Sequence, residues 1–195
     1  MAVVGLIDNL DGPPPAAALT DGQKLMVLGA TAPELGGSEW AAVVHGLDGG
    51  MPPIADLDAA VRLHGLVSAL SAERAVAGVH DCSEGGLAVA LAEMAFAGAC
   101  GFTVDVACVP CAGSTTPAEV CFSESASRVV LAVEPVAVEE VLARAEGAGV
   151  PAAVVGDAGG GRLIATGAFD IALEDAESAW REAIPAALGV TATSP

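Results

Sequence analysis

The sequence predicts an α/β or α+β sandwich, in which one mixed β-sheet has helices packed on it. Short apolar or alternating runs, typical of strands, recur along the 195 residues and are separated by segments with a helical period. Hydrophobic residues make up 53% of the chain and aromatic residues only 3%, so the core must be built from Ala, Val, Leu and Ile, which suit close helix-on-sheet packing. No repeat, low-complexity tract or long linker divides the chain, so we expect one layered domain.

The pattern also places the individual elements. Strands are expected at 3–8, 24–29, 76–79, 101–106, 129–133, 150–155, 162–166 and 169–173. Helices are expected at 56–73, 87–97, 135–148 and 174–188, and an irregular loop at 108–118. The first strand has almost no lead-in, so we expect residues 1–12 to be the end of a preceding domain or a linking strand, and residues 13–195 to be the domain itself.

The strong negative charge narrows the classes of partner. The chain has 25 acidic against 7 basic residues and a net charge of −18, whereas nucleic acids and anionic membranes are bound through Lys and Arg. The negative charge is still compatible with binding of a nucleotide if metal ions supply positive charge. There is no apolar run of about 18 residues and no signal-peptide pattern. Five Cys without a regular framework fit a reducing cytosol, so we expect a cytoplasmic protein in which Cys108 and Cys111 are structural or incidental thiols.

The most informative stretch is a polar turn between an expected strand and an expected helix, His80-Asp81-Cys82-Ser83-Glu84-Gly85-Gly86-Leu87. The glycines would let backbone approach a ligand closely, and the first turn of a helix favours an anion. Asp81 and Glu84 would repel a bare phosphate, but Mg²⁺ between them would bind carboxylates and phosphate together. The turn therefore indicates a magnesium–phosphate site. The alternative is that Ser83 or Asp81 caps the helix and the glycines only form the turn.

Two further polar stretches leave similar alternatives open. Leu35-Gly36-Gly37-Ser38-Glu39 runs into a helix and could bind an anion or, more commonly, cap that helix. Phe122-Ser123-Glu124-Ser125-Ala126-Ser127-Arg128 opens onto a buried strand. Its Arg128 could orient a phosphate or, in the commoner case, pair with Glu124.

Together and in this order, the three motifs resemble the large synthetase subunit of the phosphoribosylformylglycinamidine synthase family, which acts in the fourth step of purine biosynthesis. The resemblance runs over nearly the whole chain and is to the last domain of that subunit, the second of its two aminoimidazole-ribonucleotide-synthetase-type C-terminal domains. It implies a ligase that uses ATP to activate the amide oxygen of formylglycinamide ribonucleotide, so that ammonia from glutamine gives an amidine. The implied partners are the upstream domains and a glutaminase subunit, with or without a small bridging subunit.

The resemblance also implies roles for individual residues. Asp81 corresponds to a magnesium ligand in the first copy of this domain, and Glu124-Ser125-Ala126 to a Glu-Ser-Gln triplet that contacts the substrate. Ala126 has no amide, a departure that fits the second copy, which lines an auxiliary Mg²⁺ and ATP/ADP site. The metal ligands expected here are Asp81 and Glu84, and the expected nucleotide contacts are Gly37, Ser38, Ser83, Gly85, Gly86, Ser123, Glu124, Ser125 and Arg128.

The same resemblance places the catalytic His in an upstream domain, so we expect no catalytic residue here and no activity of this chain alone. A hypothesis of a different class is a scaffold that packs on its sister domains and on the glutaminase and binds nothing small. A third is a free-standing relative that acts as a small kinase or dehydratase and turns over ATP by itself.

Overall fold

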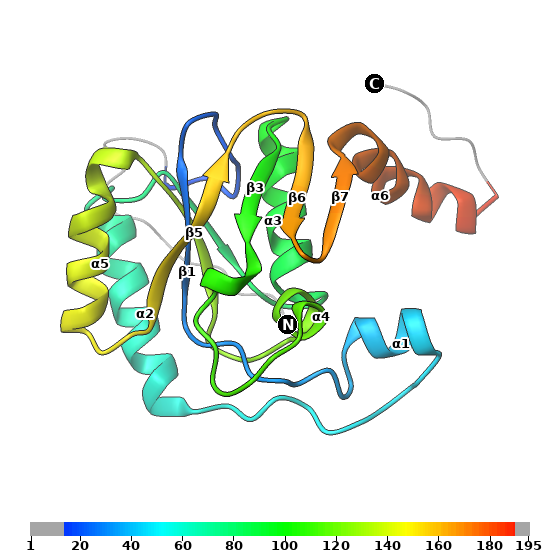
Figure 1. Ribbon diagram of the computed structural model, residues 1–195, viewed down its shortest axis with the longest axis horizontal. Helices are drawn as coiled ribbons and strands as arrows, with labels where there is room; N and C mark the ends of the chain where they lie inside the picture. The colour runs from blue at the N-terminus through cyan, green and yellow to red at the C-terminus, as the bar shows by residue number, and fades with distance from the viewer. Residues whose placement is uncertain (1–13, 190–195) are drawn as a thin grey trace.

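The computed structural model describes residues 14–189, and within them seven strands form one sheet (Figure 1). The strand order is β2-β4-β1-β5-β3-β6-β7. Neighbouring strands are antiparallel except β3 and β6, which are parallel. The strands are β1 (Lys24–Leu28), β2 (Gly78–Asp81), β3 (Phe102–Asp105), β4 (Val129–Val133), β5 (Ala152–Ala158), β6 (Arg162–Thr166) and β7 (Phe169–Ala172). The predicted single mixed sheet is confirmed.

Helices cover both faces of this sheet. They are α1 (Glu39–His45), α2 (Leu57–Ala72), α3 (Gly86–Gly98), α4 (Pro117–Phe122), α5 (Val138–Gly147) and α6 (Leu173–Ala187). Side chains of α2 and α5 share one core with the sheet, and side chains of α3 and α4 share the other. The architecture is therefore a three-layer arrangement with an apolar core on each side of the sheet.

Strands β1 and β4 are apolar on both faces. Leu25 and Val27 of β1 lie in the core under α3, while Met26 and Leu28 lie in the core under α2 and α5. This is the alternation that the period of two of a β-strand requires. Because helices cover both faces, β1 and β4 read in sequence as continuous apolar runs rather than as alternating ones.

Four elements differ from their predicted bounds by more than one residue. β2 begins at Gly78 and continues through Asp81, because residues 78–81 pair with β4. The helix expected from Pro135 begins as a 3₁₀ turn, Pro135–Ala137, before α5. β5 starts later and runs further than expected, to Ala158. The loop expected at 108–118 ends in the short helix α4.

Helix α4 has a start signal that the prediction missed. Thr116 accepts a hydrogen bond from the backbone N–H of Glu119, the Glu119 side chain accepts one from the backbone of Thr116, and Pro117 takes the first helical position. This capping box stabilises the first turn of a helix only six residues long.

The predicted strand at 3–8 and the proposed boundary at residue 12 lie outside the described residues. Within residues 14–189, no helix is both long enough and apolar enough to cross a membrane.

Candidate functional site

The three sequence motifs meet at one end of the sheet. Leu28, the last residue of β1, and Asp81, the last residue of β2, both pair with Val129, the first residue of β4. The segment after β1, the turn after β2 and the turn before β4 therefore lie side by side. The sheet register thus brings together residues that are almost a hundred positions apart.

One carboxylate joins all three motifs. Oε1 of Glu124 accepts a hydrogen bond from the backbone N–H of Glu39 at 2.8 Å and another from the backbone N–H of Gly85 at 2.9 Å. Glu39 begins α1, and Gly85 is the residue before α3. Because helix N-termini carry unpaired N–H groups and a partial positive charge, a carboxylate between two of them is favourable.

The serines on either side of Glu124 hold the segment after β1. Ser123 and Ser125 are buried. The Ser123 hydroxyl accepts from the backbone N–H of Glu34 at 3.1 Å, and the Ser125 hydroxyl accepts from that of Ala32 at 3.0 Å. Both hydroxyls therefore contact protein backbone.

Arg128 is a buried cation beneath these turns. Its side chain is only 2% exposed, and it donates to the Ser125 carbonyl at 3.2 Å, to the Thr31 hydroxyl at 2.8 Å and to the Ser123 carbonyl. Burial lowers the pKa of its guanidinium from the usual value. The ion pair with Glu124 that the sequence suggested is wrong: among the ion pairs of residues 14–189, none involves Arg128, because two backbone carbonyls and the Thr31 hydroxyl take its donors instead.

Asp81, Ser83 and Glu84 form the open side of the site. All three are exposed and line a pocket of about 310 Å³ together with His80, Ala90 and Glu93. The Ser83 hydroxyl donates to Oδ2 of Asp81, and this hydrogen bond is the main reason that the pKa of Asp81 lies below its usual value. Asp81 is therefore ionised at neutral pH and accessible to a ligand.

The two glycines shape the turn. Gly85 and Gly86 both have positive φ, 76° and 67°, which favours glycine. A Cβ on Gly86 would lie 2.4 Å from the Ser123 carbonyl oxygen, so at this position the missing side chain admits protein backbone. Residue Gly85 precedes α3, and no side chain caps this helix. The interpretation that Ser83 or Asp81 caps it is therefore wrong, because the Ser83 hydroxyl is directed at Asp81.

For the first motif the capping interpretation is confirmed. Ser38 is buried, and its hydroxyl accepts from the backbone N–H of Ala41 at 3.2 Å and donates to the Leu35 carbonyl at 2.7 Å. Gly37, at φ 71°, forms the turn before it. The helix that Ser38 caps, α1, has seven residues.

Comparison with known proteins identifies the family. The profile of the family described as AIR synthase related protein, C-terminal domain, matches residues 20–167. The chain belongs to this family. It is 40% identical over 189 residues to the phosphoribosylformylglycinamidine synthase subunit PurL of Moorella thermoacetica, covering 95% of this chain and 25% of that protein. It is 41% identical to the PurL subunit of a Nocardioides species over 97% of this chain and 24% of that protein.

Solved structures show the same fold. The structure of Thermotoga maritima PurL complexed with ATP superimposes with a TM-score of 0.69 at 20% identity, over 84% of this chain and 27% of that one. The hydrogenase maturation protein HypE of Escherichia coli gives a TM-score of 0.58 at 25% identity, over 82% of this chain and 51% of that one. The present chain thus spans about a quarter of the length of the curated PurL relatives that it matches.

This AIR-synthase-related domain offers few ligands for a metal ion by itself. Residues 14–189 contain no group of three or more His, Cys, Asp or Glu side chains arranged to hold one. Asp81 and Glu84 can supply one or two carboxylates on an open surface. Such a donor set fits Mg²⁺ bound mainly by water and phosphate oxygens, and does not fit an all-protein metal cage.

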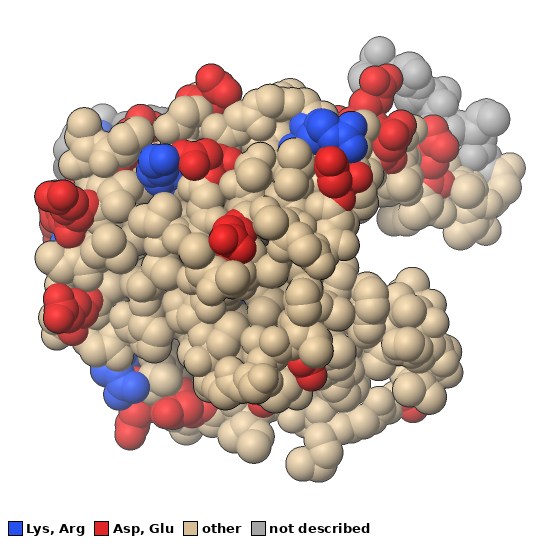
Figure 2. Space-filling model, viewed as in Figure 1, with Lys and Arg blue, Asp and Glu red and all other residues tan. Residues whose placement is uncertain are grey.

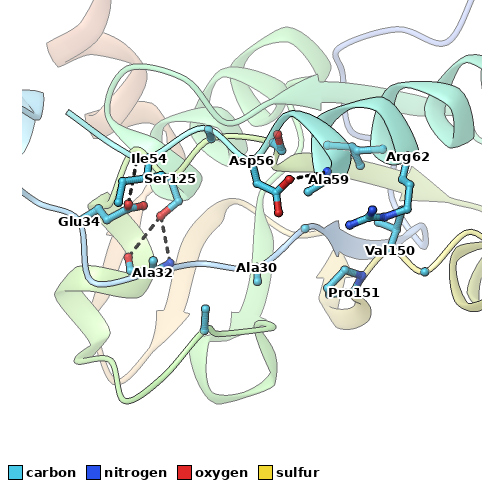
Figure 3. A pocket seen from close by; sticks show the side chains of 16 residues that line it. Ala30, Ala32, Glu34, Ile54, Asp56, Ala59, Arg62, Ser125, Val150 and Pro151 are labelled. Atoms are coloured by element: carbon cyan, nitrogen blue, oxygen red, sulfur yellow. Dashed lines mark hydrogen bonds between the residues drawn. The ribbon is translucent and has the colours of Figure 1, made fainter.

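A second pocket, of about 360 Å³, was not predicted (Figure 3). It is lined by the segment after β1, the start of α2, Ser125–Ser127 and the connection between α5 and β5. Among its lining residues are the charged side chains of Glu34, Asp56 and Arg62. Asp56 also caps α2, because its Oδ1 accepts from the backbone N–H of Ala59 at 3.0 Å.

Proposed function

We propose that this chain is the C-terminal domain of a phosphoribosylformylglycinamidine synthase large subunit. The observation that carries the proposal is the 40% identity to the Moorella thermoacetica subunit over 95% of the chain. The parent enzyme would use ATP to activate the amide oxygen of formylglycinamide ribonucleotide and let glutamine-derived ammonia displace the phosphate. Three quarters of the relatives' length lies outside the matched region, so we expect the chain alone to be inactive.

Within that enzyme, we propose that the turn Asp81–Gly86 contributes to an auxiliary Mg²⁺–nucleotide site. Two observations support this. Asp81 is ionised and accessible in an open pocket, and structures of Thermotoga maritima PurL have been solved with ATP, ADP and AMPPCP. Bound Mg²⁺ would supply the positive charge that lets a phosphate lie beside two carboxylates.

In this proposal the predicted nucleotide residues divide into two groups. Ser83, Gly85 and Gly86 belong to the turn itself, with Asp81 and Glu84 as the metal ligands. The side chains of Ser38, Ser123, Glu124, Ser125 and Arg128 hydrogen-bond to the protein, and Gly37 forms a turn. We propose that this second group serves the site by fixing the position of the turn.

A second candidate function, an interface domain that binds nothing small, is favoured by one observation. Seven large aliphatic side chains between residues 43 and 61 are each more than half exposed. We call this group the apolar rim, and its members are Val43, Val44, Leu47, Met51, Ile54, Leu57 and Val61. Figure 2 shows few charged side chains on the surface over α1. Exposed apolar patches mark interaction sites, and the other domains or subunits of the parent enzyme would cover these side chains.

A domain exchange tests the parentage. The region of the Moorella thermoacetica subunit that matches this chain would be replaced by this chain, and ATP-dependent amidine formation would be assayed with ammonia. We expect the exchanged protein to retain activity and the isolated chain to show none. Turnover of ATP by the isolated chain, or a folded exchanged protein without activity, would contradict the proposal.

A further inference from the structure

We propose that the pocket between α2 and the loops before β4 and β5 binds an aliphatic zwitterion, such as an ω-amino acid or a short apolar peptide. This pocket shares no lining residue with the one at Asp81. Ser125, an expected nucleotide contact, also lines this pocket, but the inference rests on the charged residues of α2, so it can fail without the nucleotide site at Asp81–Gly86 and the reverse.

The charged groups of the pocket lie on the start of α2. Arg62 and Asp56 both line it, and Figure 3 shows the Arg62 side chain extending from α2 toward Val150, with the Asp56 carboxylate on the same side of the helix. Among the ion pairs of the described residues, none involves Arg62. Asp56 uses Oδ1 to cap the helix, which leaves Oδ2 for a ligand. A guanidinium fork suits a carboxylate, and a carboxylate suits an ammonium group.

The floor of the pocket is apolar and fixed. It is formed mainly by small or aliphatic side chains, those of Ala30, Ala32, Leu63, Ala112, Val150 and Pro151. Ser127 is held at a φ of 58°, and its carbonyl oxygen would lie 2.1 Å from a Cβ on Gly29. The loop after β1 and the loop before β4 are thus in close backbone contact at this place. Because the pocket surface is already formed, a ligand loses little free energy in ordering it.

The balance of charge selects the ligand class. The pocket is lined by the carboxylates of Glu34 and Asp56 and by the Arg62 guanidinium. A phosphate ester would be repelled by both carboxylates, and a simple amine would leave the Arg62 guanidinium without a carboxylate. A molecule with an ammonium group at one end, a carboxylate at the other and methylene groups between them matches both charges and the alanine-lined floor. The volume of about 360 Å³ is sufficient for a small ligand.

The test is a titration of the 195-residue chain with 6-aminohexanoate, followed by calorimetry or by chemical-shift changes. For a ligand of this size we expect a Kd on the order of 1 mM. Hexanoate and hexylamine, which carry one charge each, should bind at least about tenfold more weakly. If wild type shows no saturable binding up to roughly 20 mM, or if either single-charge analogue binds equally well, the proposal is wrong.

Three variants assign the binding to this pocket. Asp56→Asn removes the charge but keeps a good helix cap, and Arg62→Gln removes the guanidinium; each should weaken 6-aminohexanoate binding about tenfold or more. The matched control is Asp58→Asn, in the first turn of the same helix but not among the residues that line the pocket. It should bind within about twofold of wild type. Equal binding by all three folded variants would overturn the assignment.

Discussion

At the scale of single residues, Glu124 connects more of the site than any other residue described above. Its one oxygen atom accepts hydrogen bonds from the start of α1 and from the turn before α3. A helix terminus with an unpaired N–H is costly wherever water has poor access. We therefore regard Glu124 as a structural link between the motifs.

Replacing Glu124 by Ala should lower the free energy of unfolding by about 1–3 kcal/mol, because two backbone N–H groups lose their acceptor. Glu124→Gln keeps an acceptor oxygen and should lower the free energy of unfolding by less than about 1 kcal/mol. The measurement is urea denaturation, with Glu84→Ala, an exposed position, as the control. A Glu124→Ala variant as stable as Glu84→Ala would show that these hydrogen bonds contribute nothing.

The lowered pKa of Asp81 gives a prediction about pH. The Ser83 hydrogen bond is the chief reason that the pKa of Asp81 is lower in the folded protein than in the unfolded chain. Ionised Asp81 therefore stabilises the fold. This contribution is fully present above the unfolded-chain pKa of about 4 and is lost as the pH falls through the lower folded-state pKa. Ser83→Ala should move the pKa of Asp81 upward in an NMR titration. It should also reduce stability at neutral pH, but not at a pH below the folded-state pKa. An unchanged Asp81 pKa in Ser83→Ala would contradict this account.

The sequence pointed to the polar turn residues that meet at this end of the sheet, but not to their contacts. Polar residues in a turn look alike whether they bind a ligand or a neighbouring loop. Ser125 holds Ala32, 93 positions away along the chain, and no local pattern shows such a pairing. From the sequence, Arg128 could orient a phosphate or pair with Glu124. It donates instead to two carbonyls and a hydroxyl, because burial demands hydrogen-bond partners for its donors.

At the scale of elements, the turn between β2 and α3 packs against the end of α4. The close approach depends on Gly86, where a Cβ would lie 2.4 Å from the Ser123 carbonyl oxygen and 2.9 Å from that of Cys121. The turn that carries Asp81 is thus fixed by backbone contact with the motif that carries Glu124.

Substituting this glycine should disturb the packing of the two elements. We expect Gly86→Ala to lower the free energy of unfolding by at least about 3 kcal/mol, because strain at positive φ adds to a clash with backbone. Gly160→Ala is the matched control, since Gly160 has a similar φ of 71° but open space around it. This substitution should lower the free energy of unfolding by only about 1 kcal/mol. Thermal or urea unfolding of both variants makes the comparison, and equal losses would exclude a packing role for Gly86.

The elements were largely predictable because period and propensity determine them locally. Asp56 caps α2 as the sequence indicates, and the apolar run 129–133 is β4. Helix α4 could have been found from Thr116, Pro117 and Glu119, whose capping box is visible in the sequence. The extension of β5 to Ala158 could not, because it depends on pairing with β1 and β3.

At the scale of the whole molecule, two surface properties oppose each other. A net charge of −18 makes copies of the chain repel one another, whereas the apolar rim favours association. Salt screens the repulsion and leaves apolar attraction in place.

The order of the strands, with β1 near the middle of the sheet, is a further whole-molecule property that local patterns could not predict.

We therefore expect association of the isolated chain to increase as ionic strength rises from about 0.02 M to about 0.5 M. Substituting Val43, Leu47 and Met51 together by Lys should abolish the increase and change the free energy of unfolding by less than about 0.5 kcal/mol per site. Val136→Lys, at a position 94% exposed and outside the rim, should associate like wild type. Sedimentation velocity measures the outcome, and association that falls with salt would contradict the role of the rim.

The most direct measurement of the central claim is a calorimetric titration of the chain with ADP, with and without Mg²⁺. If the turn Asp81–Gly86 contributes to a magnesium–nucleotide site, binding should require Mg²⁺ and disappear in Asp81→Asn. It should persist in Asp175→Asn, where the same change is made in the first turn of α6. Binding that is independent of Mg²⁺ and unchanged in Asp81→Asn would contradict a nucleotide site on this turn.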